Sequence, residues 1–366
     1  MNKCDGAAAG IVNLILGMLL CVSPVCGCAV VRAGEDTVAE WEGGKRAEIL
    51  KWFAENQFGV TPIGRPADEQ IGERSVTFAD GQITIRIHLS LPEGADAQHP
   101  VPVFVYGDHS CKNHAIPYIP VVHSGMPTNT ITGRGYAYVS WNFNDICPNA
   151  YLDAGDLQNW AYGVIAWQKT GKLGGRVERT PSSWGTIGAW AWGFSRVMDW
   201  IETRPELDAK RVAILGHSRG GKTALWAAAQ DERIAMAISN GSGCGGAKLN
   251  GFDCPDSEHI SPILWHFPNW FCQNYAHWIG RDEEITHDAD DLLRLIAPRI
   301  CYVASGSEDA WAGPAAEKEA WNRAHDLWQA YGCPEKMGYH CHPGPHRISA
   351  EDWAHFLDFA DKFLAK

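Results

Sequence analysis

The segment "RVAILGHSRGGKTALWAAAQ", residues 211–230, constrains the fold of this chain more than any other stretch. An apolar run typical of a buried strand ends at Gly216, and an alanine-rich run typical of a helix starts just after Ser218. The residues between them fit G-x-S-x-G, the strand-to-helix corner called a nucleophile elbow. Glycines permit such a strained, crowded turn, and the start of the helix favours a developing oxyanion. The corner therefore predicts a nucleophilic Ser218, and the alternative is a plain turn.

Apolar strands alternate with helices along most of the chain, which predicts an α/β fold. This pattern implies a mostly parallel sheet that is covered by helices on both faces. Residues 247–290 read as irregular, and residues 144–180 read as a long polar loop or cap. The predicted strands lie in residues 75–92 (a hairpin), 101–109, 135–143, 211–216, 234–243, 297–309 and 337–342, and the predicted helices in 37–59, 184–202, 219–230, 315–332 and 349–366.

The first 33 residues differ from the rest and are expected to be a secretory signal peptide. They contain Lys3, a short apolar core and the sequence "VRA" before Gly34, where cleavage is expected. The sequence "VCGC" leaves open a lipoprotein-type leader, and an uncleaved anchor is a third reading. Residues 35–366 are expected to form one catalytic domain, in which no segment is long and apolar enough to span a bilayer.

Composition excludes some classes of function. A formal net charge of -12 argues against a nucleic-acid-binding surface. The chain has 12 cysteines, four of them in the leader, and no C-x-x-C motif, so a zinc ribbon or a thioredoxin-like site is not expected. Export would permit disulfides, but the spacings predict no pairing. We expect no cofactor and a monomeric protein.

A serine hydroxyl is a weak nucleophile, so the corner needs a histidine base and an acid that orients it. In nucleophile-elbow enzymes the chain order is serine, acid, histidine. The histidine should lie between the last strand and the last helix, where the chain has His340, His342 and His346. We expect His346 to be the base, because it follows a Pro-Gly-Pro turn just before the final helix.

The same three histidines form the pattern H-x-H-x3-H, which a metal site could also produce. Alternate positions of a strand can point two side chains to one face. However, the local sequence supplies no set of carboxylates or cysteines to complete such a site. We therefore expect no bound metal, and we interpret His340 and His342 as structural residues.

The orienting acid should follow the strand that contains "RICYVAS". Glu308 and Asp309 both lie in the loop that begins at Gly306. We favour Asp309, because it stands three residues after the glycine, as is usual in acid loops. Glu308 stays open as the alternative, and either carboxylate could instead be a solvated loop residue.

Several longer segments resemble carbohydrate esterase family 15, the glucuronoyl esterases. In chain order they are "GTIGAWAWGFSRVMDWIE", "DAKRVAILGHSRGGKTALWAAAQDERIAMAISN", "SGCGGA", "FPNWFC", "LIAPRICYVASGSEDAWAGP" and "GYHCHPGPH". The blocks G-H-S-R-x-G-K and S-G-C-G-G-A are specific to that family. The resemblance implies an α/β-hydrolase fold, a three-layer sandwich with a mostly parallel central sheet, and no metal. It also implies cleavage of the ester between 4-O-methyl-glucuronic acid on xylan and a lignin alcohol.

The resemblance also implies roles for single residues. Ser218 would be the nucleophile and His346 the base. Arg219 would help to hold the oxyanion, Lys222 would contact sugar hydroxyls and Trp311 would flank the uronate. A lysine in the first turn of a helix is mildly unfavourable against the helix dipole, which independently suggests a use for Lys222. The alternatives are a surface lysine and a tryptophan of the core.

The loop after the strand at 101–109 usually supplies a backbone N–H to the oxyanion hole in this fold. Gly107 and Asp108 are the candidates, and the role of the Asp108 side chain is open. The chain also departs from the family at two places. Gly241 stands where some members carry the acid, so the acid should come from the later loop. An arginine-rich stretch after S-G-C-G-G-A is replaced by "KLNGFDCPDSEH", in which Glu258 could take over a sugar contact.

These observations leave three alternative hypotheses for the function. The leading hypothesis is a secreted serine carboxylesterase that acts on glucuronoxylan or lignin–carbohydrate esters. An acetyl xylan esterase or another small carbohydrate-ester hydrolase is the second, because the elbow does not fix the acyl group. A non-catalytic glycan-binding relative is the third, since Gly241 and the altered sugar loop depart from the family pattern.

Overall fold

The computed structural model describes residues 37–61, 64–108, 127–147 and 179–365. The chain divides into two units, Met1–Gly34 and Glu35–Lys366, and the description below concerns the second. The expected leader and most of the polar stretch at 144–180 lie outside the described residues. Among the helices that are described, none is long and apolar enough to cross a membrane.

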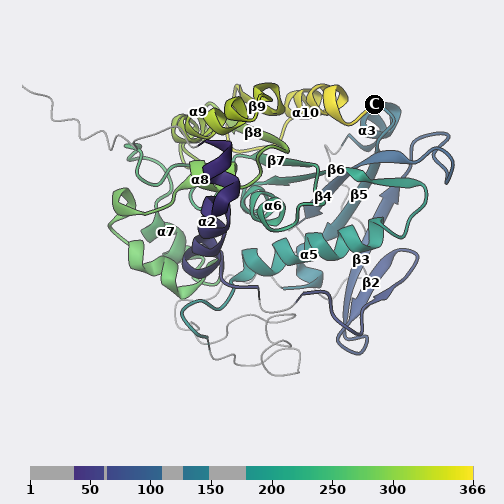
Figure 1. The fold of residues 1–366 in the computed structure, drawn as a ribbon, viewed down its shortest axis with the longest axis horizontal. Coiled ribbons are helices and arrows are strands. Elements are labelled where there is room, and N and C mark those ends of the chain that lie inside the picture. The colour runs from purple at the N-terminus through teal and green to yellow at the C-terminus, as the bar shows by residue number, and fades with distance from the viewer. Residues whose placement is uncertain (1–36, 62–63, 109–126, 148–178, 366) are drawn as a thin grey trace, which may run out of the picture. The chain divides into compact units, whose positions relative to one another are not determined.

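A nine-stranded sheet forms the centre of this unit, in the order β1-β2-β3-β5-β4-β6-β7-β8-β9 (Figure 1). The first pairs, β1 with β2, β2 with β3 and β3 with β5, are antiparallel, and all pairs from β5 to β9 are parallel. The strands are β1 (Gln70–Ile71), β2 (Ser75–Phe78), β3 (Ile83–Ser90), β4 (Val101–Asp108), β5 (Ala137–Asn142), β6 (Leu207–His217), β7 (Met236–Asn240), β8 (Ile300–Gly306) and β9 (Met337–His342). The predicted hairpin and the mostly parallel sheet are both confirmed.

Helices cover both faces of the sheet and give three layers. Two buried clusters of apolar side chains lie between the layers, one under α2, α5, α6, α8 and α9, and the other under α3 and α10. The longer helices are α2 (Arg46–Phe53), α3 (Thr128–Gly133), α5 (Thr186–Ile201), α6 (Arg219–Gln230), α7 (Ile260–His266), α8 (Ala289–Arg294), α9 (Pro314–Ala330) and α10 (Ala350–Phe363). This is the architecture that the resemblance implied, and the α/β-hydrolase fold class is confirmed.

Short helical turns complete the unit. They are α1 (Val38–Glu40), η1 (Trp41–Lys45), η2 (Ala54–Phe58), η3 (Phe143–Asp145), η4 (Gln273–Trp278), η5 (Asp282–Glu284) and η6 (Pro334–Lys336). The helix predicted at 37–59 is therefore helical almost throughout, with two wider π turns. The segment predicted as irregular, 247–290, contains α7 and short 3₁₀ turns between loops.

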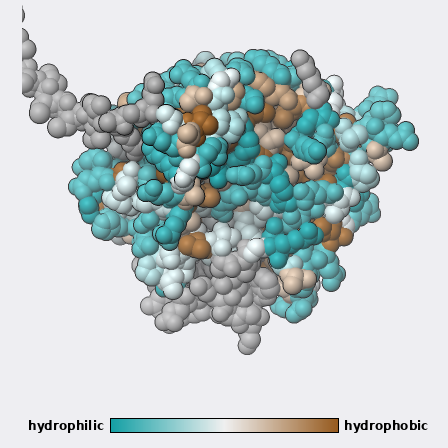
Figure 2. All heavy atoms as spheres, viewed as in Figure 1, coloured by the Kyte–Doolittle hydropathy of each residue, from teal (hydrophilic) through white to brown (hydrophobic). Residues whose placement is uncertain are grey.

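Burial explains why the parallel part reads as continuous apolar runs. Every residue of β7 and β8 is buried, whereas β3, near the antiparallel edge, alternates between buried and more exposed positions. Helix α5 is buried along its whole length except at Ser195, so its tryptophans belong to the core. On the face drawn in Figure 2, hydrophobic residues form scattered spots among hydrophilic ones.

The last helix begins as its sequence predicts. The Ser349 hydroxyl accepts the Asp352 backbone N–H, and the Asp352 carboxylate accepts the Ser349 backbone N–H, which is a reciprocal capping box. The seven cysteines among the described residues are all free thiols. Cys147, Cys244 and Cys301 are fully buried, and burial raises the pKa of each thiol to about 12. These thiols behave as small apolar core residues.

Candidate active site

Ser218 stands at the corner between β6 and α6, with φ 58° and ψ -125°. Such a positive φ is rare for a residue with a side chain and marks a strained turn. The turn is closed by hydrogen bonds from Ser218 N to Asn240 O (2.8 Å) and from Gly221 N to Ser218 O (2.8 Å). A Cβ at Gly216 would lie 1.9 Å from Gly220 O, so only glycine fits there. The geometry of a nucleophile elbow, as predicted from the sequence, is therefore present.

His346 and Asp309 form a hydrogen-bonded pair. Nδ1 of His346 lies 2.5 Å from Oδ2 of Asp309, and the other carboxylate oxygen accepts the backbone N–H of Ala312 at 3.1 Å. The Asp309 side chain is 3% exposed and the His346 side chain 39% exposed. A buried acid thus holds one nitrogen of a ring that is still open to solvent.

Glu308 lies differently. It is exposed, and its backbone N–H donates to Gly344 O at 2.9 Å, which ties the acid loop to the histidine loop. The geometry therefore favours Asp309 over Glu308 as the partner of His346. The sequence could not separate the two adjacent carboxylates, because loop direction decides which of them faces inward.

A second imidazole lies against His346. The ring centres of His217 and His346 are 4.5 Å apart, and His217 Nδ1 lies 2.6 Å from Asn240 Oδ1. Burial, and then the neighbouring His346, lower the pKa of His217 to about 4, so this ring is neutral near pH 7. Sequence reasoning missed His217 and Asn240, although His217 stands inside the G-x-S-x-G pattern.

Gly241 lies beside the same pair. It has φ +53°, and a Cβ built there would be 3.3 Å from both Asp309 Oδ2 and His346 Nδ1. A side chain at this position would therefore compete for the space that the Asp309 carboxylate now occupies. This contact gives a physical reason why a chain with its acid at 309 carries glycine at 241.

Arg219 follows Ser218 directly and packs on two aromatic rings. Its guanidinium carbon lies 4.7 Å from the ring centre of Trp270 and 5.4 Å from that of Phe267, and these two rings stack on each other. Within the part of the chain that the structure describes, the buried Nε of Arg219 has no hydrogen-bond acceptor. The guanidinium is thus held by the two rings, and its Nε–H is left for another acceptor.

Lys222, Glu258 and Trp311, the three residues predicted to bind the substrate, are in contact with one another. Nζ of Lys222 donates to Ser242 O (2.5 Å), Cys244 O (2.6 Å) and Glu258 Oε2 (3.0 Å), while Glu258 Oε1 accepts the Trp311 Nε1–H at 3.0 Å. Lys222 is buried and Trp311 is 47% exposed, so neither the surface-lysine nor the core-tryptophan reading holds. The three ammonium hydrogens of Lys222 all have protein acceptors, so a sugar hydroxyl would have to share one of them.

Gly107 is the second-last residue of β4 and lies against the ring of Phe143, where a Cβ would come within 2.1 Å of a ring carbon. The following residue, Asp108, is buried at 8% exposure. The loop that continues from Asp108 lies outside the described residues. The backbone N–H role expected for Gly107 therefore stays a prediction.

The other two histidines of the motif form a separate cluster with Asp352. His340 Nε2 and His342 Nδ1 lie 2.7 and 2.9 Å from the same Asp352 oxygen. The remaining nitrogens face Tyr302 OH at 3.1 Å and Pro345 O at 3.3 Å. This is the one group of possible metal ligands found among the described residues, and it excludes His346. Since every ring nitrogen already has a hydrogen-bond partner, the cluster reads as structural.

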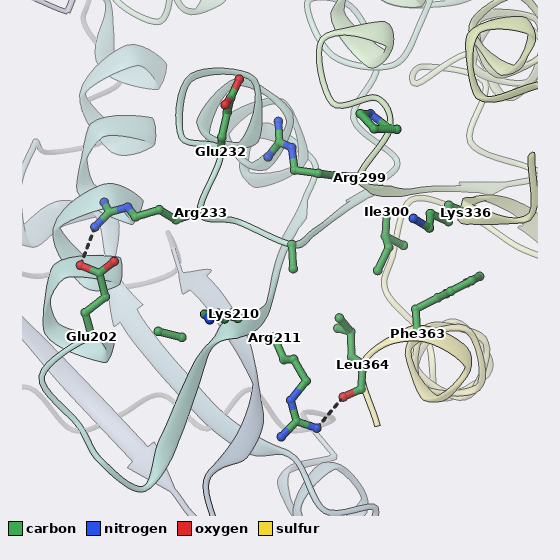
Figure 3. A pocket seen from close by; sticks show the side chains of 13 residues that line it. Glu202, Lys210, Arg211, Glu232, Arg233, Arg299, Ile300, Lys336, Phe363 and Leu364 are labelled. Atoms are coloured by element: carbon green, nitrogen blue, oxygen red, sulfur yellow. Dashed lines mark hydrogen bonds and ion pairs between the residues drawn. The ribbon is translucent and has the colours of Figure 1, made fainter. Parts of the chain in front are cut away.

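A hollow of about 680 Å³ lies at the opposite ends of the parallel strands from Ser218, near Arg211, Ile300 and Lys336 (Figure 3). The three arginines that line it already bind other groups of the protein. Arg211 donates to Leu364 O, and Arg233 pairs with Glu202 at 2.9 Å, as the dashed lines in Figure 3 mark. These contacts lie near the starts of β6 and β7, whereas Ser218 follows the end of β6.

Comparison with known proteins gives a consistent result. A family model described as glucuronyl esterase of fungi matches residues 178–332. A carbohydrate esterase from an unknown prokaryotic organism is 31% identical over an alignment of 378 positions. The alignment covers 89% of this chain and 85% of that protein. A 4-O-methyl-glucuronoyl methylesterase of Hypocrea jecorina is 33% identical over 163 residues, but the match covers 42% of this chain and 35% of that protein.

Solved structures agree with these sequence matches. A glucuronoyl esterase from Solibacter usitatus superimposes with a TM-score of 0.74 and 27% identity, covering 89% of this chain and 93% of that chain. A promiscuous esterase of carbohydrate esterase family 15 from a marine bacterial metagenome gives a TM-score of 0.73 and 27% identity over 89% of this chain and 93% of that chain. The similarity therefore extends over most of this chain.

Proposed function

This chain belongs to carbohydrate esterase family 15, the glucuronoyl esterases, and on that premise we propose that it hydrolyses esters of 4-O-methyl-glucuronic acid on xylan. The observation that carries the proposal is the strained corner at Ser218 together with the His346–Asp309 pair at 2.5 Å. A positioned serine, an imidazole and a buried carboxylate are the parts that a serine esterase needs.

In the proposed first step, Ser218 attacks the carbonyl carbon of the uronate ester. Asp309 accepts the Nδ1–H of His346, so Nε2 carries the lone pair that takes the serine proton. The tetrahedral intermediate then collapses, the ester C–O bond breaks, and the imidazolium gives its proton to the leaving alcohol. The product is an acyl-enzyme on Ser218.

In the second step the roles repeat with water. His346 takes a proton from water, the hydroxide adds to the acyl carbon, and collapse returns the proton to Ser218 and frees the uronic acid. The neutral His217 beside His346 supports this cycle, because it adds no positive charge next to the transient imidazolium.

The oxyanion of both intermediates is assigned to Arg219 and to backbone N–H groups at the start of α6, with Gly107 as a further donor. Arg219 supports this role through its position next to Ser218 and its buried Nε, which has no acceptor within the described ranges. A donor that is aimed before the reaction begins costs little reorganisation, and its removal typically lowers kcat by about 10²–10³-fold.

The sugar is proposed to lie against Trp311, with Glu258 and Lys222 behind it. An exposed indole ring offers an apolar face to a sugar, and the Glu258 oxygens have lone pairs left for sugar hydroxyls. Lys222 holds the Glu258 carboxylate in place through the 3.0 Å ion pair. In this arrangement Lys222 acts mainly through Glu258.

We also propose that residues 1–33 are removed as a signal peptide, with a lipoprotein-type leader as the alternative. The mature protein would then be one α/β-hydrolase domain of residues 35–366 that works outside the cytoplasm, where its polymeric substrate is found. The mass of the mature protein isolated from its host would test both points.

The decisive experiment measures hydrolysis of benzyl glucuronate and of acetylated xylan by the wild type and by Ser218→Ala. We expect hydrolysis of the glucuronate ester in the wild type and a loss of at least about 10⁴-fold in the variant. Ser90→Ala, on the distant strand β3, is the matched control and should keep full activity. Preference for acetylated xylan would favour the acetyl esterase instead, and activity that survives Ser218→Ala would refute the nucleophile.

A further inference from the structure

Glu317 is a fully buried carboxylate next to the site, and the proposed mechanism does not use it. It lies in the first turn of α9 and points back toward the ends of β7 and β8. Oε2 accepts the hydroxyl of Ser305 at 2.6 Å, and Oε1 accepts the backbone N–H of Gly243 at 3.0 Å and faces the Ser242 hydroxyl at 3.5 Å. No positively charged side chain within the described residues forms an ion pair with it.

These contacts join two segments that matter for the site. Gly243 lies in the turn after β7, and the carbonyls on either side of it, at Ser242 and Cys244, are the acceptors of Lys222. Ser305 lies at the end of β8, one residue before the loop that carries Asp309. Glu317 therefore connects the turn whose carbonyls accept hydrogen bonds from Lys222 to the start of the acid loop.

The surroundings of Glu317 are costly for its charge. Burial and the nearby Asp309 raise its pKa to about 7, against the stabilising hydrogen bonds from Ser305 and Gly243. The other titratable groups that interact with it electrostatically are Tyr339 and Cys341 of β9. The start of α9 favours a negative charge, but leucine or methionine would fill the same space without this cost. A buried acid in such a place calls for an explanation beyond packing.

We propose that Glu317 is a positioning residue of the active site, which fixes the turn at 242–244 and whose negative charge favours the protonated form of the His346 imidazole. Asp309 links the two groups, because it pairs with the His346 ring and interacts electrostatically with Glu317. A negative charge near an imidazole stabilises the imidazolium and raises the pKa of the ring. The proposal extends the proposed esterase function, since its turn belongs to the same sugar-binding side.

The test is an NMR titration of the His346 ring in the wild type and in Glu317→Gln, with His346→Gln used to assign the signal. Glutamine keeps the shape, its carbonyl can still accept the Gly243 N–H, and Ser305 can reverse its hydroxyl to accept from the amide. We expect the His346 midpoint to fall by about half a pH unit in Glu317→Gln. Glu319→Gln is the matched control, because this partly exposed carboxylate lies on the same helix and already pairs with Arg323.

The same variants are then assayed on benzyl glucuronate. The acid limb of kcat/KM should move to lower pH in Glu317→Gln by the same amount, with KM nearly unchanged. Glu317→Leu, which leaves the Gly243 N–H without an acceptor, should raise KM several-fold. An unchanged His346 midpoint in a folded Glu317→Gln protein overturns the inference. Because the titration needs no substrate, it decides the matter even if the wild type proves inactive on glucuronate esters and the proposed function fails.

Discussion

Two histidine–carboxylate groups lie on either side of the turn at 343–345, and they differ in what each leaves open. In one, His346 binds Asp309 through Nδ1, and its side chain is 39% exposed. In the other, His340 and His342 share an oxygen of Asp352, and their side chains are 10% and 1% exposed. Both groups combine imidazole with a buried acid.

The difference lies in the second nitrogen of each ring. Tyr302 and Pro345 occupy the second nitrogens of His340 and His342, whereas Nε2 of His346 has no hydrogen-bond partner in the part of the chain that the structure describes. A ring that is saturated with partners can hold a loop in place but cannot exchange protons with a substrate. A ring with one nitrogen held and one free is suited to general base catalysis.

The strongest test of this contrast compares His346→Gln with His342→Gln. We expect His346→Gln to lower kcat on benzyl glucuronate by about 10⁴-fold or more and to leave the unfolding free energy within about 1 kcal/mol. His342→Gln should do the reverse, costing about 2–4 kcal/mol of stability because the buried Asp352 loses a partner. Activity per folded molecule should stay within about ten-fold.

Chemical denaturation and steady-state kinetics measure both quantities on the same samples. A stable His342→Gln protein that has lost its activity would mean that the buried cluster takes part in the chemistry, and the contrast would fail. Zinc added to the wild type is a further control, since a saturated cluster should bind it too weakly to change activity or stability.

Much of this site could be predicted from the sequence, because its parts carry local patterns. The elbow needs a glycine two residues before Ser218, and the histidine must follow the last strand, so both are visible as spacing. Lys222 and Trp311 came from the family resemblance. The fold followed from the alternation of apolar strands and helices, which burial on both faces of the parallel strands enforces.

The missed features depend on contacts between distant segments. Nothing local to Glu317 says that its carboxylate reaches Gly243, and nothing local to Lys222 says that its ammonium group is surrounded by three acceptors. The choice between Glu308 and Asp309 depends on the direction of one loop turn. Such facts are set by tertiary packing, which a pattern of residue types does not record.

The second test replaces each of the two adjacent acids by its amide, in separate variants. Asp309→Asn should lower kcat by about 10³–10⁴-fold, because the amide no longer stabilises the imidazolium and favours the wrong tautomer. Glu308→Gln should change kcat less than two-fold, since this side chain is exposed and its loop contact is made by the backbone. Rates with benzyl glucuronate near pH 7 provide the measurement. Equal losses in both variants would mean that the acid loop moves when substrate binds.

The smallest expected effect is on the pH dependence of stability, which also differs between the His346–Asp309 pair and the cluster at Asp352. His217, beside the open group, has its pKa lowered to about 4, so its folding contribution is full above about pH 6.5 and is lost as the pH falls toward 4. Glu317 has its pKa raised to about 7, so its contribution is full below about pH 4.5 and is lost as the pH rises to 7. The pKa of Asp352 is lowered from 3.8, so the buried cluster loses stability only in more acidic solution.

Between pH 4.5 and 6.5 the contributions of His217 and Glu317 therefore oppose each other, and the wild type should show little change in stability from these groups. Glu317→Gln removes one of them. Relative to the wild type, this variant should gain about 2 kcal/mol in unfolding free energy between pH 5 and pH 8, because ionisation of the buried acid no longer costs energy. Denaturation at the two pH values measures the gain, and Glu319→Gln should show none. A variant whose stability relative to the wild type does not change with pH would mean that Glu317 stays ionised in the folded protein at pH 5, and that burial raises its pKa far less than its surroundings indicate.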